Sequence, residues 1–153
     1  MAEREPQPSS GLFQGPLHLF PVRVYYEDTD LTGIVYHANY LRWFERARSD
    51  MLRLLGIDQR AAVEAGEGNY AVAEVHIRYL APAKLDDDLV VETSTEDLGA
   101  ASVRLRQRAL RGGNLLAEAA VRVGFISPDG RPRRQPPAWR AAFDPLLSAK
   151  VPA

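Results

Sequence analysis

The sequence contains no cysteine, which excludes disulfide bonds, thiol nucleophiles and thiolate metal sites. It also has no apolar run long enough to cross a bilayer. Its charges nearly cancel, because 19 Lys and Arg residues face 20 Asp and Glu residues, for a formal net charge of -1. That balance lacks the basic excess typical of nucleic-acid and membrane-surface proteins. We therefore expect a cytoplasmic protein that binds no nucleic acid and inserts into no membrane.

Three common signatures of enzyme chemistry are also missing. The chain has no Gly-rich phosphate loop, no Gly-x-Ser-x-Gly elbow and no dinucleotide fingerprint. Its three histidines are His18, His37 and His76, which would have to converge from separate elements to bind a metal ion. We expect neither a metal nor a cofactor.

The remaining pattern is that of one domain with α+β architecture. A chain of 153 residues that is 46% hydrophobic can form one sizeable core. We expect a disordered N-terminal tail over residues 1–16, one domain over 17–135, and a short helix with a tail over 136–153. Alternating apolar residues predict strands over 17–26, 70–80, 89–98, 101–111 and 115–127.

One long helix is expected from residue 39 to the stop signal at Gly56. Apolar positions step by four and three through Tyr40, Phe44, Ala47, Met51 and Leu54, which predicts an amphipathic helix with Asn39 as a possible N-cap. About five antiparallel strands curved around this helix would bury its apolar face. Because such a sheet has open edges, we expect at least a dimer.

The loop that precedes this helix carries three acids, Glu27, Asp28 and Asp30. Acids so close together raise one another's pKa unless hydrogen-bond donors compensate. We interpret Glu27 and Asp28 as parts of a solvated turn. Asp30 is the catalytic candidate, since Gly33 would let the backbone approach a ligand and the helix start would supply N–H donors.

Other candidates in the loop allow two interpretations each. His37 could act through its ring as a base, but we favour its backbone N–H as an oxyanion donor. Tyr36 and Asn39 either line a substrate pocket or simply pack and cap the helix. Two arginine sets, one at 104, 106 and 108 and one at 131, 133 and 134, could meet phosphates. Arg131 and Arg133 belong to the loop set, which is the preferred candidate for binding a polyphosphate.

The residues from Tyr25 to Leu41 and from Phe44 to Arg48 resemble the 4-hydroxybenzoyl-CoA thioesterase superfamily, and within it the YbgC-type acyl-CoA thioesterases. The resemblance continues through Tyr79-Leu80-Ala81-Pro82-Ala83, Asp86-Asp87 and residues 115–119, and covers residues 21–134. It implies a hot-dog fold, in which a central helix is wrapped by a curved sheet. It also implies dimers or tetramers, with a homotetramer as our expectation, and a site at the subunit interface.

The resemblance further implies acyl-CoA thioester hydrolysis without a cofactor. Asp30 would act as nucleophile or general base, and the backbone N–H of His37 would polarise the thioester carbonyl. Leu31-Thr32 is bulkier than the pairs common in relatives, which affects how the loop admits an acyl chain.

Two alternatives are kept. One is a hot-dog enoyl-CoA hydratase, in which Asp30 and His37 transfer protons. The other is a non-catalytic adaptor for an acyl carrier protein or for the Tol-Pal system, in which the arginine clusters would dock an acidic partner.

Overall fold

A computed structural model describes residues 3–148. Its six strands form one antiparallel sheet in the order β1-β2-β4-β5-β6-β3. The strands are β1 (Leu12–Gln14), β2 (Leu17–Arg23), β3 (Asn69–Tyr79), β4 (Asp88–Leu98), β5 (Ser102–Arg111) and β6 (Asn114–Ile126). The helices are α1 (Asn39–Leu54), α2 (Gln59–Glu64) and α3 (Pro137–Phe143), with 3-10 turns at Tyr26–Asp28 and Asp144–Ser148. The described chain contains no helix long and apolar enough to span a membrane.

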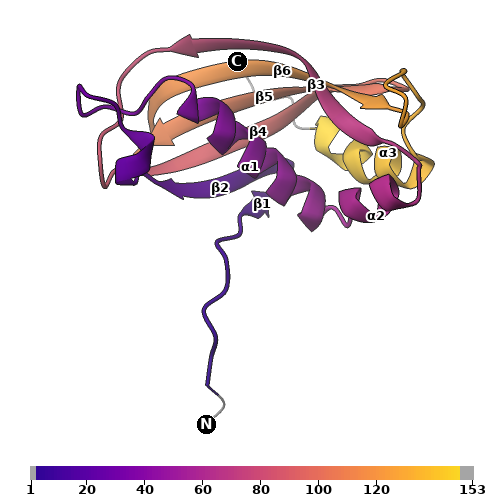
Figure 1. The fold of residues 1–153 in the computed structure, drawn as a ribbon, viewed down its shortest axis with the longest axis horizontal. Coiled ribbons are helices and arrows are strands. Elements are labelled where there is room, and N and C mark those ends of the chain that lie inside the picture. The colour runs from indigo at the N-terminus through magenta and orange to yellow at the C-terminus, as the bar shows by residue number, and fades with distance from the viewer. Residues whose placement is uncertain (1–2, 149–153) are drawn as a thin grey trace.

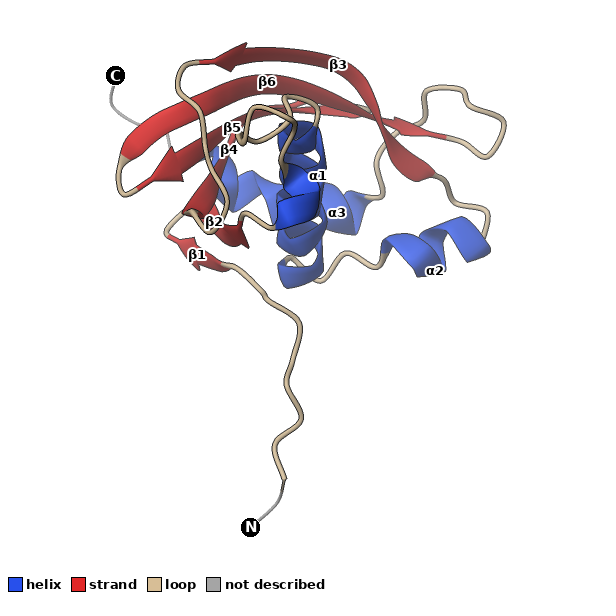
Figure 2. Ribbon diagram, turned by 60° about the vertical axis from the view of Figure 1, so that its left-hand side comes forward, coloured by secondary structure: helices blue, strands red, loops and turns tan. Residues whose placement is uncertain are grey.

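The sheet curves around α1, which lies against its concave face (Figure 2). The connection from β2 to α1 lies at one end of the sheet, whereas α2 and α3 lie at the other end (Figure 1). The core is formed where α1 meets the inward side chains of β2, β4, β5 and β6. This is the predicted α+β arrangement, with β1 as an additional short strand.

The buried face of α1 differs from the prediction at two positions. Tyr40, Phe44, Ala47 and Met51 are buried as expected, but Trp43 is also buried and Leu54 is exposed. At 3.6 residues per turn, position 54 falls on the same stripe as positions 40, 43, 44, 47 and 51. Its exposure goes with its place as the last residue of α1. The N-cap also shifts by one residue, since α1 is capped by Ala38 and begins at Asn39.

A bulge changes which side chains of β3 face the core. The register with β6 shifts between Val72 and Glu74, and a bulge of one residue moves the following side chains to the opposite face. Val72 and Val75 therefore both lie opposite buried residues of β6, Val123 and Val121. The strict alternation expected from residue 71 to residue 79 was wrong at this point.

The predicted tail is partly ordered. β1 pairs with β2, and the segment before it is attached to α1 through Asp50. The carboxylate of Asp50 accepts hydrogen bonds from Ser10 Oγ at 3.0 Å and Gly11 N at 2.9 Å, and it lies 2.7 Å from Nε2 of the buried His18. A Cβ atom at Gly11 would collide with the carbonyl oxygen of Leu19, so this attachment requires glycine.

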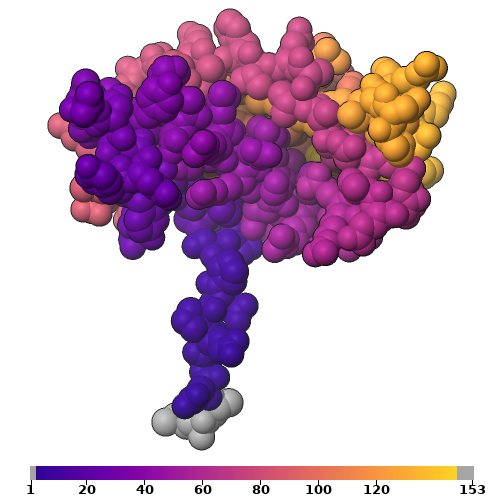
Figure 3. All heavy atoms as spheres, viewed as in Figure 1, coloured from indigo at the N-terminus to yellow at the C-terminus, as the bar shows by residue number. Residues whose placement is uncertain are grey.

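Before Ser10 the chain projects from the body (Figure 3). Within the expected tail, residues 12–14 pair with β2, which satisfies their backbone. Its first two residues, and residues 149–153 of the C-terminal segment, lie outside the described part of the chain.

Candidate active site

The loop between β2 and α1 is a tight hairpin closed by backbone hydrogen bonds. Asp30 N donates to Ile34 O at 2.9 Å, and Gly33 N donates to Asp30 O at 3.0 Å. Gly33 has a φ of 80° with open space around it, so glycine is needed here for the backbone conformation. The loop therefore holds Asp30 at an exposed tip.

The carboxylate of Asp30 is bound on one side only. Both the backbone N–H and the hydroxyl of Thr32 donate to its Oδ1, at 2.8 Å and 2.5 Å. These two bonds, and to a smaller degree the charge of nearby His37, lower the pKa of Asp30 below the ordinary value of 3.8. Asp30 is therefore an ionised carboxylate at neutral pH, and no described residue donates a hydrogen bond to its Oδ2.

Asp28 does not belong to a solvated turn, as the sequence suggested, because its side chain is only 7% exposed. Its Oδ2 accepts a hydrogen bond from Tyr25 N at 2.8 Å, and its Oδ1 accepts a short one from the side-chain amide of Asn39. Tyr36 N also donates to the backbone oxygen of Asp28 at 2.9 Å. These bonds fasten the acidic loop to the first turn of α1.

This role of Asp28 and Asn39 was missed from the sequence. Asn39 was considered as a cap or a pocket residue, but its side chain is 9% exposed and engages Asp28. No local pattern in the sequence marks this pair, because it forms only when the loop folds back onto α1. Glu27 is exposed, as predicted.

His37 and Tyr36 lie exposed just before α1. Their rings are 4.5 Å apart between centroids, and the His37 ring is 6.1 Å from that of Tyr79. The hydroxyl of Tyr79 donates to His37 O at 2.7 Å. The N–H groups of His37 and Ala38 donate to no atom within residues 3–148, so two donors at the positive end of the helix are free.

This geometry brings together most of the residues singled out in the loop. An ionised carboxylate, a left-handed glycine turn and two free N–H groups share the entry to α1. Leu31, which is fully exposed, stands next to Asp30 and adds an apolar surface. The arrangement suits attack on a carbonyl carbon whose oxygen gains negative charge.

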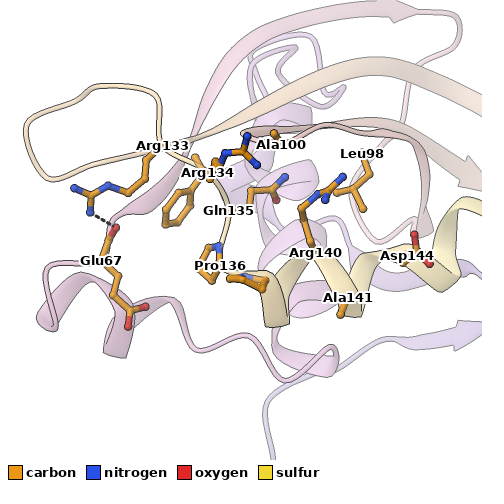
Figure 4. A pocket seen from close by; sticks show the side chains of 12 residues that line it. Glu67, Leu98, Ala100, Arg133, Arg134, Gln135, Pro136, Arg140, Ala141 and Asp144 are labelled. Atoms are coloured by element: carbon orange, nitrogen blue, oxygen red, sulfur yellow. Dashed lines mark hydrogen bonds between the residues drawn. The ribbon is translucent and has the colours of Figure 1, made fainter.

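The candidate phosphate-binding arginines lie elsewhere. Arg133 lines a hollow of about 770 Å³ together with Arg134, Arg140 and Asp144 (Figure 4). Its guanidinium donates to Glu67 O at 2.7 Å, the contact drawn in Figure 4. Arg131 is not among the residues that line this hollow. It is exposed, and its Nε lies 3.6 Å from Asp129 Oδ2.

This basic hollow and Asp30 occupy opposite ends of β3. Arg133 contacts the loop that leads into Asn69, whereas His37 contacts Tyr79 at the other end of the strand. A strand of 11 residues spans roughly 35 Å at about 3.3 Å per residue. Within one chain, the two sites are therefore far apart.

Two of the three arginines in the β5 set are occupied by acids, whereas Arg104 is exposed. Arg106 pairs with Glu96 and Glu118, and Arg108 pairs with Glu92. These pairs form a ladder across the convex face of the sheet, so Arg106 and Arg108 offer little to a phosphate. Within residues 3–148, no group of three or more His, Asp or Glu side chains is placed to hold a metal ion.

Comparison with known proteins identifies the family of this fold. Residues 24–147 match the thioesterase-like superfamily. The chain belongs to this superfamily. This finding confirms the family that the loop and helix residues predicted from the sequence.

Individual relatives support the same assignment. Acyl-CoA thioesterase YbgC of Haemophilus influenzae is 42% identical over 128 residues, which are 83% of this chain and 94% of that protein. Acyl-CoA thioester hydrolase YbgC of Escherichia coli O6:H1 is 41% identical over 129 residues, covering 83% of this chain and 96% of that protein.

Solved structures confirm the predicted hot-dog fold. A probable thioesterase from Bartonella henselae superposes with a TM-score of 0.74 at 37% identity, over 78% of this chain and 99% of that one. SAV2348 from Staphylococcus aureus, solved in complex with CoA, superposes with a TM-score of 0.82 over 91% of this chain and 89% of that one. At 18% identity, the latter is a likeness of fold.

Proposed function

We propose that this protein hydrolyses acyl-CoA thioesters to a free acid and CoA, with Asp30 as the reacting carboxylate. The observation that carries the proposal is the position of an exposed, ionised Asp30 beside the free N–H groups of His37 and Ala38. The family assignment and the two YbgC relatives support it.

The hydrogen bonds of Asp30 indicate which oxygen reacts. Because Thr32 holds Oδ1, Oδ2 is the oxygen available for chemistry. As a general base, Oδ2 takes a proton from water while the water oxygen bonds to the thioester carbon. As a nucleophile, Oδ2 itself bonds to that carbon and forms an anhydride, which water then hydrolyses. In either route the C–S bond breaks and CoA leaves as the thiolate, which takes up a proton.

The start of α1 stabilises the charge that develops during this step. The N–H of His37, with that of Ala38 beside it, would donate to the thioester oxygen as it becomes an oxyanion. We assign this role to the backbone of His37, whose carbonyl is held by Tyr79. The site includes no cofactor in this mechanism.

The other loop residues would position the substrate. Gly33 and Tyr36 are exposed around Asp30 and would contact the pantetheine or the acyl group. Asn39 is bound to Asp28 and would act indirectly, by holding the loop against α1.

A dimer paired through β3 would complete the site. β3 has β6 on one side and no described strand on the other, and its inward residues Val72, Val75 and Tyr79 remain exposed. An open edge with uncovered apolar residues favours antiparallel pairing with a second copy. Such pairing brings the Asn69 end of one subunit to the Tyr79 end of the other. The hollow at Arg133, with Arg131 near it, would then face the Asp30 loop of the partner and bind the CoA phosphates.

The decisive experiment measures thiol release from short, medium, long and aromatic acyl-CoAs by the wild type and by Asp30→Asn. We expect release by the wild type and its near-complete loss in the variant, with the folded state and oligomeric state unchanged. Glu27→Gln is the matched control, because Glu27 is exposed in the same loop and should leave turnover intact. Equal activity in wild type and Asp30→Asn would refute the assignment of Asp30, and no release from any thioester would refute the function.

A further inference from the structure

A second hollow lies between α1 and β3, on the half of the helix that is distant from the Asp30 loop. It has a volume of about 300 Å³, and Arg48 contributes to its wall. Most of the residues that line it are apolar, among them Met51, Leu52, Leu105, Val123 and Phe143, and Glu45 also lines it. Arg48 follows His37 by eleven residues, which corresponds to roughly 16 Å along the helix axis. We call this hollow the α1–β3 cleft.

Arg48 is held in place by a neutral partner. Its Nη1 donates to Gln107 Oε1 at 2.8 Å. Gln107 is fully buried, and its own amide donates to Phe44 O at 2.9 Å and to Thr93 Oγ1 at 3.0 Å. Because both groups of the Gln107 amide are engaged, the Arg48 guanidinium has a fixed support.

No carboxylate of residues 3–148 forms an ion pair with Arg48. Each of the other half-buried arginines among residues 3–148 forms an ion pair with a carboxylate. These are Arg106, Arg108, Arg111 and Arg122. Burial lowers the pKa of Arg48, and the charge of Glu45, which is exposed and also lines the cleft, opposes this effect without forming an ion pair. A half-buried cation without a counter-charge is costly, so an anion in the cleft would be stabilised.

The remaining donors of Arg48 can reach such an anion. None of its guanidinium nitrogens is among the buried atoms that lack a partner in the described chain. Its unengaged N–H groups therefore remain accessible, and Arg48 lines the cleft. A guanidinium pairs with a carboxylate through two parallel hydrogen bonds.

We propose that the α1–β3 cleft binds a small carboxylic acid with an apolar body. The carboxylate pairs with Arg48, and the aliphatic or aromatic body packs on Met51, Leu105 and Phe143. Acids of this class are what thioester hydrolysis releases, so the source of the ligand rests on the proposed function, whereas the binding itself does not. A cleft of about 300 Å³ is at the small end of ligand sites, which favours short and medium acids.

Calorimetric titration of octanoate into the Asp30→Asn protein tests this site without any turnover. Octanamide is the matched ligand, because it has the same chain length and no charge. We expect octanoate to bind at least about tenfold more tightly than octanamide, and the preference to weaken with salt. Equal binding of the two ligands, or no binding of octanoate, would overturn the proposal.

Two variants place the site at Arg48. Arg48→Gln should abolish the preference for the acid, whereas Arg46→Gln, which changes an exposed arginine of the same helix, should preserve it. Val72 lines the cleft and is 48% exposed, so Val72→Phe should fill the cleft and weaken both ligands. Because Val72 also lies on the β3 edge proposed to pair, the oligomeric state of this variant is compared with that of the wild type. An acid preference that survives in Arg48→Gln, or octanoate binding unchanged in Val72→Phe, would refute the location.

The outcome is separable from that of the proposed function. Thiol release by the wild type without octanoate binding would overturn the cleft proposal alone. Octanoate binding without thiol release from any acyl-CoA would overturn the proposed function and leave the cleft as an acid-binding site.

Discussion

Exchanging Asp28 and Asn39 should show how the acidic loop is fastened to α1. Both side chains are less than 10% exposed and form an amide–carboxylate hydrogen bond. Asn39→Asp would place two carboxylates against each other. The loss of a bond to a charged group costs about 1.5–3 kcal/mol, and the repulsion adds to it. We expect this variant to lose about 3 kcal/mol of unfolding free energy.

The reverse change should be milder. In Asp28→Asn, the new amide oxygen can still accept from Tyr25 N, and its NH₂ group can donate to a rotated Asn39. A neutral bond then replaces a charged one, at a cost of about 1 kcal/mol. The double variant restores an amide–carboxylate pair with its direction reversed. It should therefore lose only about 1 kcal/mol and be about 2 kcal/mol more stable than Asn39→Asp alone. The coupling energy of the two changes is then about 3 kcal/mol, at the upper end of the usual range for contacting residues.

Urea unfolding of the wild type, the two single variants and the double variant gives the four unfolding free energies that are compared. Thiol release from one acyl-CoA, measured on the same samples, shows whether the loop still supports turnover. Glu27→Gln is the control, and its unfolding free energy should change by less than about 0.5 kcal/mol. If the double variant is no more stable than Asn39→Asp, the two side chains do not form the pair and the reasoning fails. Turnover should recover together with stability.

Further changes test separate parts of the structure. Thr32→Val removes the hydroxyl that most strongly lowers the pKa of Asp30. This pKa then rises, and the acid limb of the kcat/KM profile should move to higher pH, whereas the control Thr29→Val should leave it in place. An acid limb that does not move in Thr32→Val would contradict the assignment of Asp30 as the reacting carboxylate. Tyr79→Phe deletes one neutral bond to His37 O, worth about 0.5–1.5 kcal/mol, and should lower kcat about two- to tenfold at constant KM; a changed KM alone would argue against a positioning role. Phe44→Ala, at a fully buried position, should cost about 3–5 kcal/mol in urea unfolding, far more than Leu41→Ala at an exposed one.

Much of the fold was predictable because the sequence repeats its pattern over long elements. The period of α1 and the alternation of β4, β5 and β6 predicted their extent to within one or two residues. β1 was missed because three residues are too few to show a period. The face of β3 was misassigned because the bulge between Val72 and Glu74 is a tertiary feature, and local alternation carries no sign of it.

The residues of the candidate site could be chosen from the sequence, but their hydrogen bonds could not. Asp30 and His37 could be selected because an acid, a glycine and a helix start follow one another closely in the chain. The bond between Asp28 and Asn39 depends on how the loop folds back, and Thr32 binds Asp30 only within that turn. The contact of Tyr79 with His37 joins residues 42 positions apart, which no local pattern can indicate.

The attachment of the N-terminal segment to Asp50 determines how much of that segment can be removed. Trimming up to Ser9 would leave the bonds of Ser10 and Gly11 to Asp50 intact. Removing Gly11 as well would expose the flank of His18, which is fully buried in the intact chain, and leave β1 unanchored. Limited proteolysis should therefore stop just before Ser10, and a shortened version of the protein should begin there rather than at the first residue of β1.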